Sequence, residues 1–232
     1  MVGIVAALYD EVYSIVHLLK YTKIEGIPQY TGKINGISVS LYLTKPGLQK
    51  ISKFQKWQTQ HSFRSFINAG FAGALTDNFK HGDAVIAKKV ISNKTEKFYL
   101  KTEKLDKIFK PKTLYTTDKP VFSFEDKEDI YYLSKADIVD MEAHKILKAS
   151  DDIGTKTDKW HILKIIGDLP GDETFLEKEV SFRDFFTSKS FSKKLNIIKN
   201  TGLKTSWLLY KRKKFLQETL YNSLFKLIGS LD

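Results

Sequence analysis

Apolar residues follow two alternating patterns along this chain, and each pattern predicts a different kind of element. A continuous apolar run at residues 3–8 is typical of a strand covered on both faces, and the mostly apolar segments 65–69, 84–91 and 160–166 predict further strands. Between such runs, apolar positions recur three and four residues apart, which is the period of a helix with one buried face. Further strands are expected at 37–43, 113–117 and 137–140, and helices near 12–19, 48–61, 125–133, 141–150 and from 173 onward.

Turn signals divide these elements. Asn35-Gly36 lies between segments 29–31 and 37–43 and predicts a hairpin, because a tight two-residue turn needs positive φ angles. Residues 70–74 form a glycine-bearing segment that we interpret as a turn after the preceding strand. The charged, aperiodic stretch 92–112 is expected to be the longest loop.

The C-terminal segment is predicted to be helical, with Gly202 separating an earlier helix from a terminal one. An apolar stripe along the terminal helix is interpreted as core packing in preference to a partner site. The stripe consists of Trp207, Leu208, Phe215, Leu216, Leu220 and Leu224.

Strands that alternate with helices predict an α/β fold. A chain of 232 residues is long enough for one sizeable domain, so residues 1–232 are expected to form a single three-layer α/β/α domain. Its central sheet should be mixed and largely parallel, with helices on both faces.

The net charge of +11 raises the question of nucleic-acid binding. Nearly all of the excess is lysine, and the three arginines are Arg64, Arg183 and Arg212. Since arginine supplies the bidentate fork that reads bases and phosphates, we favour a solvated, lysine-rich surface and expect no nucleic-acid partner. The basic cluster at 211–214 is interpreted as a helix face.

Composition excludes several kinds of chemistry. The chain has no cysteine, so it has no disulfide, thiolate nucleophile or cysteine-ligated metal. The five histidines lack metal-ligand spacing, and we expect neither a metal nor a cofactor. The apolar start of the chain lacks a basic flank and is interpreted as a strand, not a signal peptide. No run has bilayer-spanning length, so a cytoplasmic protein without a transmembrane segment is expected.

Acidic residues follow three of the predicted strands. Glu11 comes after the first strand, Glu142 and its neighbour Met141 follow the strand at 137–140, and Asp168 ends the run at 160–166. Ligands of open α/β sheets bind beyond the carboxyl ends of the strands. These acids are therefore expected to meet at one rim, together with the segment at 70–73.

Five motifs in order resemble the superfamily of purine nucleoside phosphorylases and methylthioadenosine/S-adenosylhomocysteine nucleosidases. They are residues 3–12, residues 68–75 with 81–85, the Val-Asp-Met-Glu-Ala run at 139–143, Ile-Gly-Asp at 166–168, and residues 181–185. Residues 117–121 look closest to the hopanoid-associated branch, which includes an adenosylhopane nucleosidase or phosphorylase. The resemblance implies a nucleoside phosphorylase-like fold, a small-molecule nucleoside substrate and a homo-oligomer.

The resemblance also implies roles. Asp168 would deliver a proton to N7 of a departing purine, which requires a raised carboxyl pKa. The alternative role for Asp168 is a structural one, as the N-cap of a helix. Glu142 would bind the ribose hydroxyls above Met141, against the alternative of a helix-end carboxylate beside a core methionine. Glu11 would orient or deprotonate a water, unless it merely favours the first turn of a helix.

Two departures from the family pattern qualify these roles. Phe71 stands where the family commonly has serine, and Gly167 replaces the serine before the acid. A phenylalanine cannot contact phosphate through a hydroxyl group, which favours water as nucleophile.

The predicted activity is therefore release of free base from an adenosine-type nucleoside, with or without a 5′ substituent. One alternative is phosphorolysis, with phosphate as co-substrate, and the other is a catalytically degenerate nucleoside-binding protein. Further contacts to the substrate are expected from Gly70, Phe71 and Ala72, and Val121 and Phe122 are expected to pack on the base.

Overall fold

The computed structural model describes residues 1–94, 96–172 and 203–231. Its strands are β1 (Val2–Ala6), β2 (Lys20–Ile24), β3 (Ile27–Ile34), β4 (Ile37–Leu43), β5 (Ser65–Ala74), β6 (Ala84–Ser92), β7 (Phe98–Tyr99), β8 (Lys110–Thr116), β9 (Ile138–Asp140) and β10 (Trp160–Asp168). Its helices are α1 (Tyr13–Val16), α2 (Ile51–Thr59), α3 (Phe124–Ser134), α4 (Ala143–Asp151) and α7 (Leu203–Gly229), with a 3₁₀ turn at Thr157–Lys159.

All described strands join one mixed sheet, in the order β10-β6-β8-β9-β5-β1-β4-β3-β2, with β7 on β6. Pairing is parallel in the centre, where β1 lies between β4 and β5 and β10 pairs with β5. Because β10 also pairs with β6, strands β5, β10, β6, β8 and β9 close into a ring. The predicted α/β class and mixed sheet are confirmed; the closed ring was not predicted.

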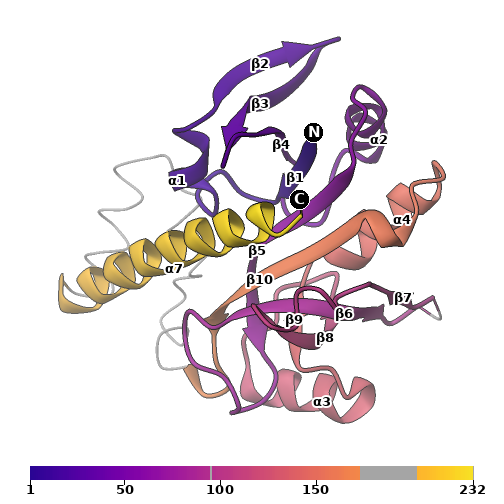
Figure 1. Ribbon diagram of the computed structural model, residues 1–232. Helices are drawn as coiled ribbons and strands as arrows, with labels where there is room; N and C mark the ends of the chain where they lie inside the picture. The colour runs from indigo at the N-terminus through magenta and orange to yellow at the C-terminus, as the bar shows by residue number, and fades with distance from the viewer. Residues whose placement is uncertain (95, 173–202, 232) are drawn as a thin grey trace.

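Helices cover both faces of the sheet, as Figure 1 shows. On one face, Trp57 of α2 and Ile146 of α4 join a buried cluster with strand residues. On the other face, Ile15 of α1 joins a second cluster with Leu216 and Leu220 of α7. The predicted three layers are therefore present.

The predicted hairpin is confirmed as β3 and β4, with Asn35 and Gly36 at φ 51° and 76°. The expected helix at 12–19 is shorter than predicted, since α1 has a single turn and β2 follows at Lys20. In the expected loop at 92–112, β7 forms an antiparallel pair with β6, and β8 already begins at Lys110.

The glycine-bearing turn expected at 70–74 is wrong, because β5 continues without a break through Ala74. The glycines instead give room to carboxylates. A Cβ added at Gly70 would lie 3.0 Å from Oε1 of Glu11, and one at Gly73 would lie 2.8 Å from Oδ2 of Asp168. Glycine in a strand often marks such a close approach. The glycines at 70 and 73 therefore indicate where the carboxylates of Glu11 and Asp168 pack on the strand, and not a turn.

Helix α7 packs as a core element through Leu216, Leu220 and Leu224, which are buried, whereas Leu208 and Phe215 are about half exposed. The side chain of Trp207, the expected helix from 173 and the motif at 181–185 lie outside the described residues. Within the described ranges, no helix is long and apolar enough to cross a membrane.

Candidate active site

A cavity opens at the ends of the strands, where the sequence pattern expected a site. It is lined by residues that follow β1, β8 and β9, by part of β5, and by one residue of α7. Seven predicted site residues contribute to its walls: Glu11, Phe71, Ala72, Val121, Phe122, Met141 and Glu142. Gly70 and Asp168 do not line it, although both lie next to residues that do.

Glu11 is held by backbone groups from two segments. Its Oε2 accepts a hydrogen bond from the amide of Leu8 at 2.9 Å, and its Oε1 accepts one from the amide of Phe71 at 3.2 Å. The carboxylate therefore joins the loop after β1 to the middle of β5. Burial raises the pKa of Glu11, although nearby Lys164 and these amides act in the opposite direction. Glu11 lies before α1, and the first turn of that helix contains no acidic residue. The alternative role for Glu11, a carboxylate that stabilises the first turn of a helix, is therefore not the one that the structure shows.

Glu142 stands at the N-cap of α4, but its side chain makes no capping hydrogen bond. Its Oε1 instead accepts from the amide of Gly47 at 3.0 Å. Burial, and then the charge of Asp140, raise the pKa of Glu142 to about 7, while Lys164 opposes the shift. Glu142 is thus a cavity carboxylate that takes up and releases a proton near neutral pH.

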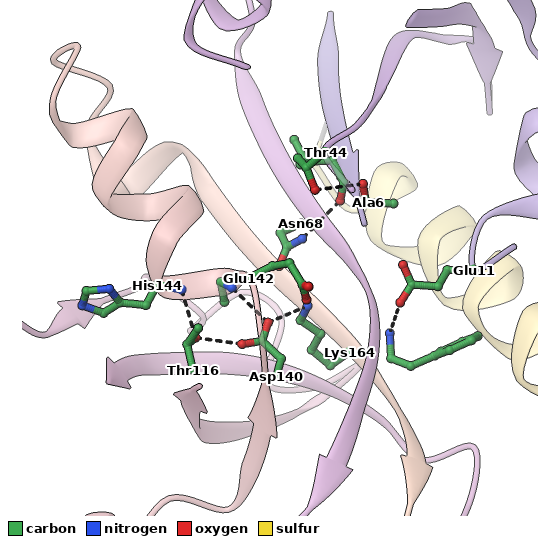
Figure 2. A network of polar contacts seen from close by, with 12 residues as sticks. Ala6, Glu11, Thr44, Asn68, Thr116, Asp140, Glu142, His144 and Lys164 are labelled. Atoms are coloured by element: carbon green, nitrogen blue, oxygen red, sulfur yellow. Dashed lines mark hydrogen bonds and ion pairs between the residues drawn. The ribbon is translucent and has the colours of Figure 1, made fainter. Parts of the chain in front are cut away.

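The helix-capping role belongs to Asp140. Its Oδ2 accepts from the amide of Ala143 at 3.0 Å, and its Oδ1 accepts from the hydroxyl of Thr116 at 2.7 Å. Thr116 in turn accepts from the amide of His144, which connects β8 to the first turn of α4. Figure 2 shows this network beneath Glu142. With Asp140 engaged in structure, Met141 and Glu142 are left as the cavity residues of the motif.

Lys164 supplies the positive charge of this region and was missed by sequence reasoning. Its Nζ lies 2.8 Å from Oδ2 of Asp140, and both side chains are fully buried. Burial alone would lower the pKa of Lys164, but Asp140, Glu142 and Glu11 together raise it. The available signal was a lysine within the apolar run of β10, where strand alternation points it to the same face as Ile162 and Ile166.

Asp168 also has a partner that the sequence did not reveal. Its Oδ2 lies 2.5 Å from Nζ of Lys127, a residue of α3 with 1% of its side chain exposed. The carboxylate packs over Gly73, whose backbone lines the cavity. Asp168 is therefore beside the cavity wall, and its charge is directed toward α3.

The two departures from the family pattern lie together. A Cβ added at Gly167 would lie 3.5 Å from the Cβ of Phe71, so the small residue leaves room for the large one. The carbonyl of Gly167 accepts a hydrogen bond from Arg212 of α7, which also contacts Asp172 at 2.7 Å. The basic cluster at 211–214 is thus partly a set of contacts to the site loops and not only a solvated helix face.

The candidate metal ligands of this protein are its histidine, aspartate and glutamate side chains. Within residues 1–94, 96–172 and 203–231, no group of three or more histidine, aspartate or glutamate side chains could hold a metal ion.

Several known proteins are similar to this chain in sequence or in fold. The model of the phosphorylase superfamily matches residues 1–107. A 5′-methylthioadenosine/S-adenosylhomocysteine nucleosidase from Maridesulfovibrio salexigens is 32% identical over 99 residues, which cover 38% of this chain and 40% of that protein. The match thus spans about two fifths of the relative's length.

Solved structures share the fold at lower sequence identity. A Helicobacter pylori nucleosidase holding 5′-methylthioadenosine has a TM-score of 0.66 at 15% identity, over 95% of this chain and 98% of that one. A Chlamydia trachomatis protein bound to the same type of ligand gives 0.67 at 15% identity, over 99% and 97%. Futalosine hydrolase of H. pylori gives 0.63 at 16% identity, over 91% and 96%.

None of these proteins is described as hopanoid-associated, and that branch stays a prediction. Residues 1–107 match the model of the phosphorylase superfamily, and nearly the whole chain shares its fold with these solved structures.

Proposed function

We propose that this protein hydrolyses the N-ribosidic bond of an adenosine-type nucleoside, with or without a 5′ substituent, and releases the free base. The observation that carries the proposal is the pair of carboxylates, Glu11 and Glu142, which reach one largely apolar cavity from the ends of two different strands. The nucleosidases among the relatives support the same reaction class.

The proposed reaction uses these groups at separate atoms. Water forms the new bond to C1′ of the ribose while the bond from C1′ to N9 of the purine breaks. Glu11 takes the proton that the water loses, and Asp168 delivers a proton to N7 of the departing base. Glu142 accepts hydrogen bonds from the ribose hydroxyls, and its negative charge favours the cationic sugar of the transition state.

Water is favoured over phosphate by the charge of the cavity. Four acidic residues line it, namely Asp10, Glu11, Asp140 and Glu142. The cation among the described lining residues, Lys213, lies 3.0 Å from Asp10. A phosphate dianion would enter an excess of negative charge with Phe71 in place of a hydroxyl, whereas neutral water avoids that repulsion. The proposed reaction therefore needs no cofactor and no phosphate.

A nucleoside panel assayed with and without phosphate tests the proposal. We expect free adenine and the free sugar from adenosine, 5′-methylthioadenosine or S-adenosylhomocysteine, at a rate that phosphate does not change. A sugar 1-phosphate as product would replace hydrolysis by phosphorolysis. No base from any substrate under either condition would reject both reactions.

A second candidate function is nucleoside binding without turnover. It is favoured by the direction of the Asp168 carboxylate, which meets Lys127 and does not line the cavity. Stabilisation by adenosine in a thermal-shift assay, with no base released over hours, would support this function over the enzyme. We further propose a cytoplasmic homo-oligomer, which light scattering on the purified protein tests for subunit number.

The pKa of Glu142 predicts how activity depends on pH. Its carboxylate form is the one that accepts hydroxyl protons, and this form prevails above a pKa of about 7. We expect kcat/KM, which reports ionisations of the free enzyme, to rise about tenfold per pH unit below 7 and to level off above it. In the Glu142→Gln variant, kcat/KM should no longer rise with pH below 7. If kcat/KM of that variant still rises with pH below 7, the ionisation belongs to another group.

A further inference from the structure

Lys127 is a buried lysine whose only described charged partner is an acid of the candidate site. Its ammonium lies 2.5 Å from Oδ2 of Asp168 and 3.0 Å from the carbonyl oxygen of Leu169. It belongs to α3, and the residues just before that helix, Val121 and Phe122, line the cavity. One short segment therefore supplies both a wall of the cavity and the partner of Asp168.

Stability alone gives a weak reason for this lysine. Burying an ammonium has a large desolvation cost, and an ion pair often stabilises no more than apolar packing of the same volume. The side chain of Asp168 is 34% exposed, so water could solvate this carboxylate without a buried partner. Apolar residues surround the neighbouring part of α3, including Leu75 and Ile130, and would accept a methionine at position 127.

The pair lies behind one wall of the cavity. Asp168 aligns with Gly73 in the register of β10 and β5, and its Oδ2 packs directly over that glycine. Gly73 and Val139 both line the cavity, so a single layer of residues separates the Asp168 carboxylate from it. Among the described residues, Oδ1 of Asp168 has no hydrogen-bond partner and is available to a ligand.

We propose that Lys127 is the positioning residue of the leaving-group acid and the source of its proton. This inference rests on the proposed function. Lys127 passes one ammonium proton to Oδ2 of Asp168, and the side chain of the resulting carboxylic acid then turns its protonated oxygen toward N7 and gives up that proton as the bond to N9 breaks. Lys127 is then a neutral amine beside the Asp168 carboxylate, and it regains a proton from solvent before the next turnover.

A double-mutant cycle tests whether Lys127 acts through Asp168. We expect Lys127→Met and Asp168→Asn each to lower kcat for a purine nucleoside about 100-fold. Groups that act as one unit are not additive, so the double variant should fall within about threefold of either single variant. Losses that multiply to about 10,000-fold would overturn the inference.

Two substrates separate the chemistry from damage to the fold. The leaving group of 4-nitrophenyl β-riboside departs without a proton, so Lys127→Met should change its rate less than about threefold. Equal losses on both substrates would mean that Lys127 is structural. Lys112→Met is the matched control, because it breaks a partly buried pair with Asp137 outside the cavity and should leave both rates unchanged.

Lys127→Arg separates orientation from proton supply. A guanidinium still pairs with Asp168 but does not give up a proton, so this variant should remain about 100-fold slow on the purine nucleoside. Wild-type turnover by Lys127→Arg would overturn the assignment of Lys127 as the proton source.

Adenine binding, measured by calorimetry, keeps this inference separate from the proposed function. We expect Lys127→Met to weaken adenine binding about tenfold in the wild-type background and not at all in Asp168→Asn. If the wild-type protein cleaves nothing, the proposed function fails, and the adenine cycle still decides whether the pair recognises the base. Unchanged adenine affinity in Lys127→Met would reject the inference.

Discussion

Replacing Glu11 with glutamine is expected to lower kcat for base release by about 1,000-fold. The carboxylate has two proposed tasks, since it takes a proton from the attacking water and places negative charge near the cationic sugar. Glutamine retains the size of the side chain but performs neither task. The expected loss exceeds that for Asp168→Asn, because an asparagine amide can still donate a hydrogen bond to N7 of the base.

The fold should survive this change. Both carboxylate oxygens of Glu11 accept backbone amides, from Leu8 and Phe71, and glutamine can satisfy only one of the two. The lost hydrogen bond costs about 1 kcal/mol, which the removal of a buried charge partly offsets. Single-turnover rates measure the loss of activity in Glu11→Gln, and thermal melts measure whether the fold is retained. Activity within tenfold of wild type would remove Glu11 from the mechanism, and the exposed Glu103→Gln provides the control for a glutamate-to-glutamine change.

Replacing Lys164 with methionine is expected to lower the free energy of unfolding by about 3–5 kcal/mol at pH 7.5. Its ammonium is the partner of Asp140 inside the protein, and it also reduces the repulsion between Asp140, Glu142 and Glu11. Methionine fills the space but leaves these carboxylates without a nearby positive charge. Denaturant unfolding of the two proteins measures the difference.

The pH dependence of that loss distinguishes charge from packing. The pKa of Glu142 is raised to about 7, so part of the negative charge disappears as pH falls below this value. The loss in Lys164→Met should therefore be smaller at pH 5.5 than at pH 7.5, and adding Asp140→Asn should recover part of it. A loss independent of pH would point to a packing defect. Lys112→Met, in a partly exposed pair, should cost no more than about 1 kcal/mol.

The sequence predicted most of the elements in their order, and it brought several candidate residues to one cavity, because both depend on local pattern. Apolar runs identified the central strands, and the rule for strand ends brought Glu11 and Glu142 to one rim. Asn35-Gly36 fixed its hairpin for the same reason, since the turn chemistry is contained in two residues. The roles of these acids remain predictions.

The remaining features depend on contacts between residues distant in sequence. Gly70 and Gly73 indicated a turn, yet they serve a continuous strand on which two carboxylates pack, one from residue 11 and one from residue 168. Lys127 lies in the predicted helix at 125–133, and only the path of β10 past α3 reveals its partner. Pairing across such separations leaves no periodic signal in the chain.

Helix α7 reaches back from the end of the described chain to its beginning. Lys213 pairs with Asp10, Gln217 donates a hydrogen bond to the carbonyl of Asp10, and Asn35 donates one to the carbonyl of Phe225. During synthesis, the loop that carries Glu11 leaves the ribosome about 200 residues before the helix that fixes it. The nascent chain can thus complete its binding site only after every described strand has been synthesised, and ligand affinity should appear only as α7 docks.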